Sequence, residues 1–164
     1  MALENFTEVK MKIRITVGDD QKLNGYLNLD PISKFDDVAV DIRNLDEVAE
    51  DSECNEILAD DVVGFLERSD ALQAMSNWIK KLRKNGKIII TAVDAHVVSG
   101  LFYTGQIDLE TFNKLLHGNL SAPWDIRLSN TTIEDVSEFL VSRGLVVTKK
   151  RQNGKRITIE AQRK

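Results

Sequence analysis

Carboxylates follow almost every predicted strand of this chain, and carboxylates at such positions can bind a sugar, an amine or a metal ion. Asp19, Asp30, Asp41, Asp60 and Asp94 each stand at or just after the end of an apolar or alternating stretch. In an open parallel sheet, ligands bind in the crevice outside the carboxyl ends of the strands. The spacing therefore predicts that several of these side chains line one crevice.

Each acid has a simpler interpretation beside the functional one. Asp30 can accept hydrogen bonds from the hydroxyls of a ribose, or it can form an Asx turn before the proline that follows it. Asp41 can approach an adenine amino group with Ile42 against the ring, or it can close a turn. The pair at 60–61 can share a proton or cap the next helical turn. No stretch has the acid spacing of a calcium loop, so we expect no metal site.

Other reactive side chains are few. His96 and His117 are the two histidines, and His96 follows a predicted strand at the carboxyl edge of the sheet. Either histidine can act as a general base or can be a solvated surface residue. Cys54 precedes a predicted buried strand and is expected to pack as a small apolar residue. No nucleophile elbow, phosphate-binding loop or zinc motif is present.

Hydrophobic periodicity predicts the elements that position these residues. Alternation or apolar runs indicate strands at 11–17, 26–29, 37–40, 56–59, 87–93, 145–149 and 156–161. Helical spacing indicates helices at 70–83, at 108–116 and from a cap at Asn130 or Thr131 to 143. The stretch 87–93 is typical of a strand buried on both faces, and Asn153-Gly154 indicates a hairpin turn.

This order of elements predicts an α/β fold with three layers. We expect a Rossmann-like, mostly parallel sheet with an antiparallel C-terminal hairpin. The 164 residues fit a single domain over 1–164, with 1–10 as a loose N-terminal segment. The link between the first two strands is shorter than a helical crossover normally requires.

The net charge of −4 conceals an asymmetry along the chain. Residues 1–70 carry 7 basic and 18 acidic side chains, so 7 − 18 = −11, and residues 71–164 carry 15 and 8, so 15 − 8 = +7. One cysteine excludes an intramolecular disulfide, and the apolar runs are too short to span a bilayer. A cytoplasmic location is the expectation. The basic tail at 149–156 lacks aromatic stacking partners, which does not favour nucleic-acid binding.

Four stretches in this order resemble the small class I S-adenosylmethionine-dependent methyltransferases, in particular the methyltransferase-11-like type. The stretch 12–30 (KIRITVGDDQKLNGYLNLD) is similar to the first motif followed by the ribose-binding acid. The stretch 37–45 (DVAVDIRNL) is similar to the adenine-contacting segment, and 50–62 resembles the region of the fourth strand. The stretch 78–90 (WIKKLRKNGKIII) resembles the turn into the fifth strand, and 124–127 (WDIR) fits the C-terminal half.

The resemblance implies a cofactor and a set of roles. S-adenosylmethionine would be bound by Gly18, Asp19, Asp30, Asp41, Ile42 and Asp60, with Asp30 on the ribose, Asp41 and Ile42 around the adenine, and Asp60 near the amino group. An unidentified small-molecule acceptor would enter over the loop at 94–106, with its pocket formed by His96, Phe102 and Tyr103. No metal is implied, and a homodimer is one expected assembly.

The sequence also departs from the family pattern. Thr16 stands where the first-motif glycine is expected, and Asn85 replaces the usual proline or glycine before the fifth strand. The positions of the family's His, Glu and His correspond to Asp61, Gly64 and Phe65. These departures keep a second interpretation open, in which the chain is a catalytically inactive binding or assembly module.

Overall fold

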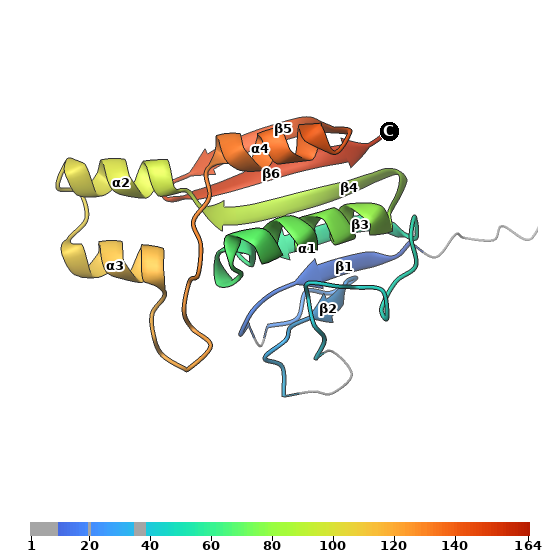
Figure 1. Ribbon diagram of the computed structural model, residues 1–164, viewed down its shortest axis with the longest axis horizontal. Helices are drawn as coiled ribbons and strands as arrows, with labels where there is room; N and C mark the ends of the chain where they lie inside the picture. The colour runs from blue at the N-terminus through green and yellow to red at the C-terminus, as the bar shows by residue number, and fades with distance from the viewer. Residues whose placement is uncertain (1–9, 20, 35–38) are drawn as a thin grey trace, which may run out of the picture.

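A single mixed sheet organises the chain in the residues that the computed structural model describes, which are 10–19, 21–34 and 39–164. The strands are ordered β2-β1-β3-β4-β6-β5 across this six-stranded sheet (Figure 1). They are β1 (Lys12–Ile15), β2 (Leu27–Leu29), β3 (Cys54–Asp60), β4 (Leu82–Val93), β5 (Leu145–Asn153) and β6 (Arg156–Arg163). The helices are a short 3-10 turn η1 (Val63–Phe65), α1 (Arg68–Lys81), α2 (Ala95–Tyr103), α3 (Leu109–His117) and α4 (Ile133–Ser142).

Strand directions confirm the predicted fold class. The first four strands pair in parallel, whereas β6 is antiparallel to both β4 and β5. The carboxyl ends of the parallel strands therefore meet at one edge, beside the α2–α3 pair and the segment that follows α3 (Figure 1). The fold is thus α/β and Rossmann-like, with an antiparallel C-terminal hairpin.

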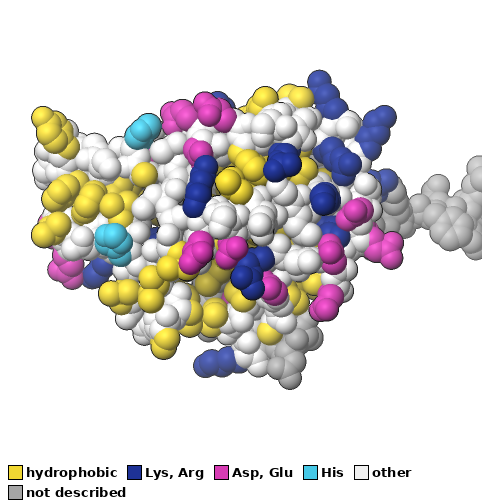
Figure 2. Space-filling model, viewed as in Figure 1, with side chains coloured by type: hydrophobic (Ala, Val, Ile, Leu, Met, Phe, Trp, Pro, Cys, Tyr) yellow, Lys and Arg dark blue, Asp and Glu magenta, His cyan; other side chains and the backbone are white. Residues whose placement is uncertain are grey.

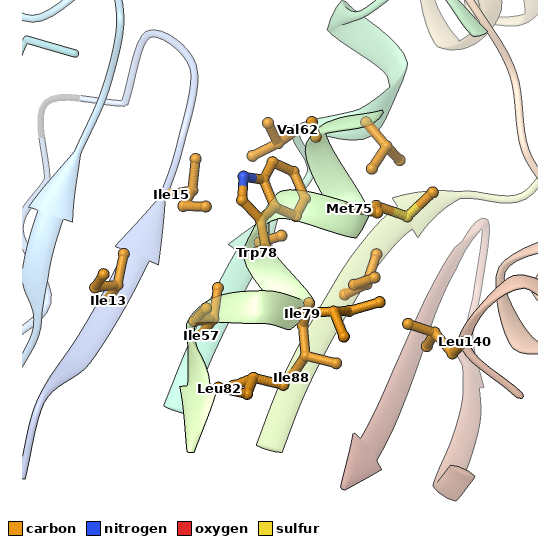
Figure 3. Close-up of a cluster of buried hydrophobic side chains, with 14 of the residues drawn as sticks. Ile13, Ile15, Ile57, Val62, Met75, Trp78, Ile79, Leu82, Ile88 and Leu140 are labelled. Carbon is orange, nitrogen blue, oxygen red and sulfur yellow. The ribbon is translucent and has the colours of Figure 1, made fainter. Parts of the chain in front are cut away.

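The core lies between the sheet and helices α1 and α4. Ile13, Ile57 and Ile88 point from three neighbouring strands towards Trp78 and other apolar side chains of α1, and all four are fully buried (Figure 3). The Trp78 indole N–H also donates to the Ile42 carbonyl at 2.7 Å, which ties the chain after the second strand to α1. Cys54 lies in the same core, and burial raises the pKa of its thiol to about 11, which keeps it uncharged at neutral pH.

The opposite face of the sheet carries charged side chains. Lys12, Glu56, Lys87, Glu160 and Lys149 alternate in sign across the strands, and successive pairs approach within 3.8, 3.7, 3.7 and 4.0 Å. Gln21 and Tyr26 contact this face, where a third layer was predicted, through the Gln21 carbonyl on Arg14 and the Tyr26 hydroxyl on Glu56. Parallel strands are usually covered on both faces. Here oppositely charged side chains on neighbouring strands stabilise a face that no helix among the described residues covers.

Three local predictions differ from the structure. Of the strand expected at 37–40, residues 37 and 38 lie outside the described residues, and 39–40 are not in a strand. The helix predicted to reach 83 ends at Lys81, and Asn85 and Gly86 lie inside β4, at an irregularity in its pairing with β3. Ile89 is half-buried while Ile88 and Ile90 are fully buried, so β4 is covered on one face rather than on both.

Asp94 connects the carboxyl edge of the sheet to two helices. Its carboxylate accepts hydrogen bonds from the amides of His96 (2.8 Å) and Val97 (3.2 Å) in α2, and from that of Ile133 (2.9 Å) in α4. The residue is 2% exposed. Asp94 is thus explained by helix capping rather than by ligand binding.

Replacing Asp94 with alanine should therefore lower the free energy of unfolding by about 2–4 kcal/mol, since the amides of two helices lose their acceptor. Asp108→Ala is the matched control, because Asp108 caps α3 alone, through the Thr111 amide at 2.8 Å. That variant should lose about 1 kcal/mol. Urea unfolding measures both values, and equal losses in the two variants would contradict the double role of Asp94.

No helix among the described residues is long and apolar enough to cross a membrane.

Candidate functional site

Two adjoining cavities lie at the carboxyl edge of the parallel strands. The first, which we call the apolar cavity, has a volume of about 540 Å³ and is lined largely by Val17, Ile32, Val40, Ile42 and Leu66. The second, the charged cavity, has a volume of about 390 Å³ and is lined by residues that include Asp19, Asp60, Asp61, Arg127 and Arg156. Both volumes lie in the range of small-molecule sites.

Asp41 and Ile42, which the resemblance assigns to the adenine, line the apolar cavity. Ile42 presents an aliphatic wall and is 3% exposed. Asp41 lies at the rim, where its carboxylate pairs with the Arg43 guanidinium through contacts of 3.0 and 2.9 Å. Hydrogen bonds from Arg43 lower the pKa of Asp41, so the group stays ionised and keeps lone pairs to accept a further donor.

Asp30 lies behind the wall of the crevice and does not line either cavity. One of its oxygens accepts from the Thr16 hydroxyl at 3.1 Å and from the Asp19 amide at 3.0 Å, and the other accepts from the Ile32 amide at 2.9 Å. The residue is 7% exposed. Thr16, which replaces the expected glycine, thus uses its hydroxyl to hold this carboxylate inward. The ribose role of Asp30 stays a prediction.

Arg14 holds Asp19 and Asp60 together at the charged cavity. Its guanidinium lies 2.9 Å from a carboxylate oxygen of each acid and donates to the Gln21 carbonyl at 2.7 Å. Hydrogen bonding from the Gln21 amide, and then from Arg14, lowers the pKa of Asp19. With two acids on one arginine, this end of the cavity carries a net negative charge that suits an ammonium group.

Asp61 forms a second ionic cluster at the other end of the charged cavity. Arg127 binds both of its oxygens, at 3.0 and 2.7 Å, and Arg156 approaches one of them at 3.5 Å. The guanidinium of Arg127 also lies over the Phe65 ring, 4.8 Å from its centre. This cluster carries a net positive charge, and the half-exposed Arg156 leaves donors free for an anionic group.

Gly18 lines neither cavity, and its backbone packs against the Trp124 ring. The Trp124 ring lies against the Gly18 backbone and is tilted by 54° from Phe65, with ring centres 6.2 Å apart. Trp124, Arg127 and Arg156 were not among the site residues predicted from sequence, and Asp61 was considered only as half of a carboxylate pair with Asp60. The sequence signal for these residues was the motif at 124–127, which contains Trp124 and Arg127. Because this motif is far along the chain from the first strands, the sequence did not indicate that it contacts them.

The three residues predicted to form the acceptor pocket lie on the α2–α3 arm instead. Phe102 stacks on Phe112 with ring centres 4.3 Å apart, and Tyr103 is 92% exposed. His96 is exposed beside Glu134, at 3.7 Å. None of the three lines the apolar or the charged cavity. Figure 2 shows hydrophobic side chains gathered at this end of the molecule. Because none of the three residues lines a cavity, their role in an acceptor pocket stays a prediction.

Comparison with known proteins places the fold among methyltransferase structures. No family model and no curated protein matches the sequence. The structure is similar to a SAM-dependent methyltransferase from Thermotoga maritima, with a TM-score of 0.62, 15% identity, and 94% of this chain and 82% of that one covered. It is also similar to 1,6-didemethyltoxoflavin-N1-methyltransferase from Burkholderia thailandensis, which was solved with S-adenosylhomocysteine. That match has a TM-score of 0.55 and 10% identity, and it covers 84% of this chain and 60% of that one.

A third similar structure is an O-methyltransferase family protein from Burkholderia thailandensis, with a TM-score of 0.52 and 12% identity. The match covers 76% of this chain but 34% of that protein, so this chain spans about a third of its length. At these identities the comparisons establish a shared fold. The chain therefore shares the fold of these methyltransferase structures.

Proposed function

We propose that this protein binds S-adenosylmethionine in the crevice at the carboxyl edge and transfers its methyl group to a small acceptor. The observation that supports the proposal is the apolar cavity itself, which lies in the size range of small-molecule sites and is lined in part by Asp41 and Ile42. Its neighbour, the charged cavity, supplies an acidic end and a basic end for a zwitterionic tail. The solved structures of similar fold that are named above are methyltransferases.

The residues fit the cofactor in the following way. Ile42 packs against the adenine ring, and Asp41 accepts from its amino group. Asp60 and Asp19 attract the ammonium of the methionine part, and Gly18 admits that part to the backbone of the first loop. The bound cofactor supplies a methyl group on a sulfonium, and this chain's contribution to the transfer is to align an acceptor behind that carbon and to restrict water.

A second candidate function follows from Thr16, Asp30 and Trp124. Their mutual contacts fill the first loop, with Asp30 already holding three donors and the Trp124 ring lying on Gly18. These observations favour a protein that keeps the fold as a binding or assembly module without turnover. Calorimetry with S-adenosylhomocysteine distinguishes the two, because a module without the cofactor site shows no heat of binding at millimolar ligand.

Replacing Asp30 with alanine should weaken the binding of S-adenosylhomocysteine more than tenfold, if the carboxylate turns to the ribose when ligand binds. The loss of three hydrogen bonds also lowers stability, so binding must be separated from folding. Adenosine and 2′-deoxyadenosine make that separation. The unaltered protein should prefer adenosine, and Asp30→Ala should bind both equally. A preference that survives the substitution refutes the ribose contact.

A further inference from the structure

Trp124 lies directly on Gly18, the glycine that remains of the first motif. A Cβ atom at position 18 would collide with Cη2 of the indole and would lie 2.5 and 2.6 Å from its Cζ2 and Cζ3. Gly18 also has a φ of +71°, which side-chain-bearing residues rarely adopt. The absence of a side chain at position 18 is therefore used by an indole of the same chain, at the place proposed for the methionine part of a cofactor.

Two anchors hold the indole there. On one side, the buried Asp125 carboxylate accepts from the Ser121 hydroxyl at 2.6 Å and from the amides of Ser121 and Asn119 at 3.3 and 3.4 Å. On the other side, Arg127 makes its two-pronged contact with Asp61, just beyond β3. The Asp125 contacts thus close the loop on itself, and the Arg127 contact ties its end to the residue that follows β3.

The same indole divides the crevice. Trp124 lines both the apolar cavity and the charged cavity, together with Val17 and Phe65. A ligand that has its nucleoside in the first cavity and its charged tail in the second must cross the place where the ring lies. A ligand confined to the first cavity has no such conflict.

We propose that Trp124 is an autoinhibitory gate, which must leave Gly18 before the methionine part of the cofactor can bind. The proposal rests on the proposed function, and the structure described here is then the closed state. Closure costs affinity for ligands with a methionine tail and leaves the affinity for adenosine unchanged, because binding must offset the loss of the contact between the indole and Gly18. The gate links cofactor entry to movement of the Trp124 side chain away from Gly18.

Calorimetry with two ligands and two variants tests the gate. Trp124→Ala should bind S-adenosylhomocysteine at least tenfold more tightly than the unaltered protein and should bind adenosine no more tightly. Leu120→Ala is the matched control, because Leu120 is on the same loop, is 67% exposed and lines neither cavity. It should match the unaltered protein for both ligands, with circular dichroism confirming that each variant is folded.

The outcomes separate failure of the gate from failure of the proposed function. If S-adenosylhomocysteine binds Trp124→Ala as well as or more weakly than the unaltered protein, the gate is overturned while the function stands. If adenosine gains affinity by the same factor, the ring merely narrows the apolar cavity, and the gate is again overturned. If neither ligand binds any variant at millimolar concentration, the proposed function fails and the gate fails with it.

Tryptophan fluorescence gives a readout in the unaltered protein. The chain has two tryptophans, and Trp78 is fully buried, so a ring that moves into water is Trp124. S-adenosylhomocysteine should shift the emission to longer wavelength. Adenosine is the control for any change in the emission of Trp78, and it should cause no such shift. Trp124→Phe should lose the shift. A saturated complex whose emission matches that of the adenosine complex would overturn the gate.

Discussion

Replacing Ile32 with tryptophan should abolish measurable binding of S-adenosylhomocysteine. Ile32 lines the apolar cavity and is 37% exposed, so a larger side chain can be accommodated there without disturbing the core. An indole at this position occupies space that the proposed adenine and ribose require. We expect a loss of at least about a hundredfold, which corresponds to about 2.7 kcal/mol of binding free energy.

Ile126→Trp is the matched control for this experiment. Ile126 is 43% exposed and lines neither cavity, so the same substitution there adds an indole to the surface alone. Calorimetry with S-adenosylhomocysteine and with adenosine should show both ligands lost in Ile32→Trp and both retained in Ile126→Trp. Retention of both affinities in Ile32→Trp would place the nucleoside outside the apolar cavity.

Local patterns in the sequence were enough to predict most of the sheet. The alternation of Ile13 and Ile15 and the apolar run at 88–90 follow from burial against helices, and the Asn153-Gly154 turn specifies the last hairpin. The α2 helix was missed, although Asp94 caps it, because a short apolar stretch after a strand resembles a loop over a pocket. Tertiary packing decided this element, since α2 pairs with α3.

Part of the lining of the two cavities was predictable, where the position of an acid just after a strand determines where its side chain lies. Asp41 and Ile42 reach the apolar cavity, and Asp19 and Asp60 reach the charged cavity. Asp30 does not, because the Thr16 hydroxyl draws its carboxylate inward, and such a contact between two strands leaves no spacing signal. Arg127 meets Asp61 across 66 residues of sequence, so no local pattern could pair them.

The charged face of the sheet also explains how the chain accommodates a short first connection. A helix between β1 and β2 would cover the strand positions that Lys12, Arg14 and Glu56 occupy. Here Gln21 and Tyr26 lie on that face instead, with the Tyr26 hydroxyl on Glu56 and the Gln21 carbonyl on Arg14. Burial, followed by the hydrogen bond to Glu56, raises the pKa of Tyr26 to about 12, so the phenol stays protonated as a donor. Polar contacts thus replace the apolar contacts of a helix.

Arg14 is the residue whose loss should disturb that arrangement most. Arg14→Leu should lower the free energy of unfolding by about 2–4 kcal/mol, because Asp19 and Asp60 are then left facing each other without a cation. This value is below the cost of a fully buried pair, since the carboxylates are 43% and 31% exposed and water screens them. The free energy of unfolding of Arg14→Lys should lie between those of the unaltered protein and Arg14→Leu, because an ammonium keeps the charge but cannot bridge both acids.

A double variant and a pH series identify the cause of that loss. Arg14→Leu with Asp60→Leu should recover much of the stability, because an apolar pair replaces the ionic one, and urea unfolding measures the recovery. The folded-state pKa of Asp19 lies below its unfolded value, so its stabilisation is present at neutral pH and is lost as the pH falls through the folded-state pKa. Without Arg14 that pKa returns towards its ordinary value, and the gap between the two proteins should narrow in acid. A gap that is constant with pH, or a double variant no more stable than Arg14→Leu alone, would mean that Arg14 contributes through packing and not through its charge.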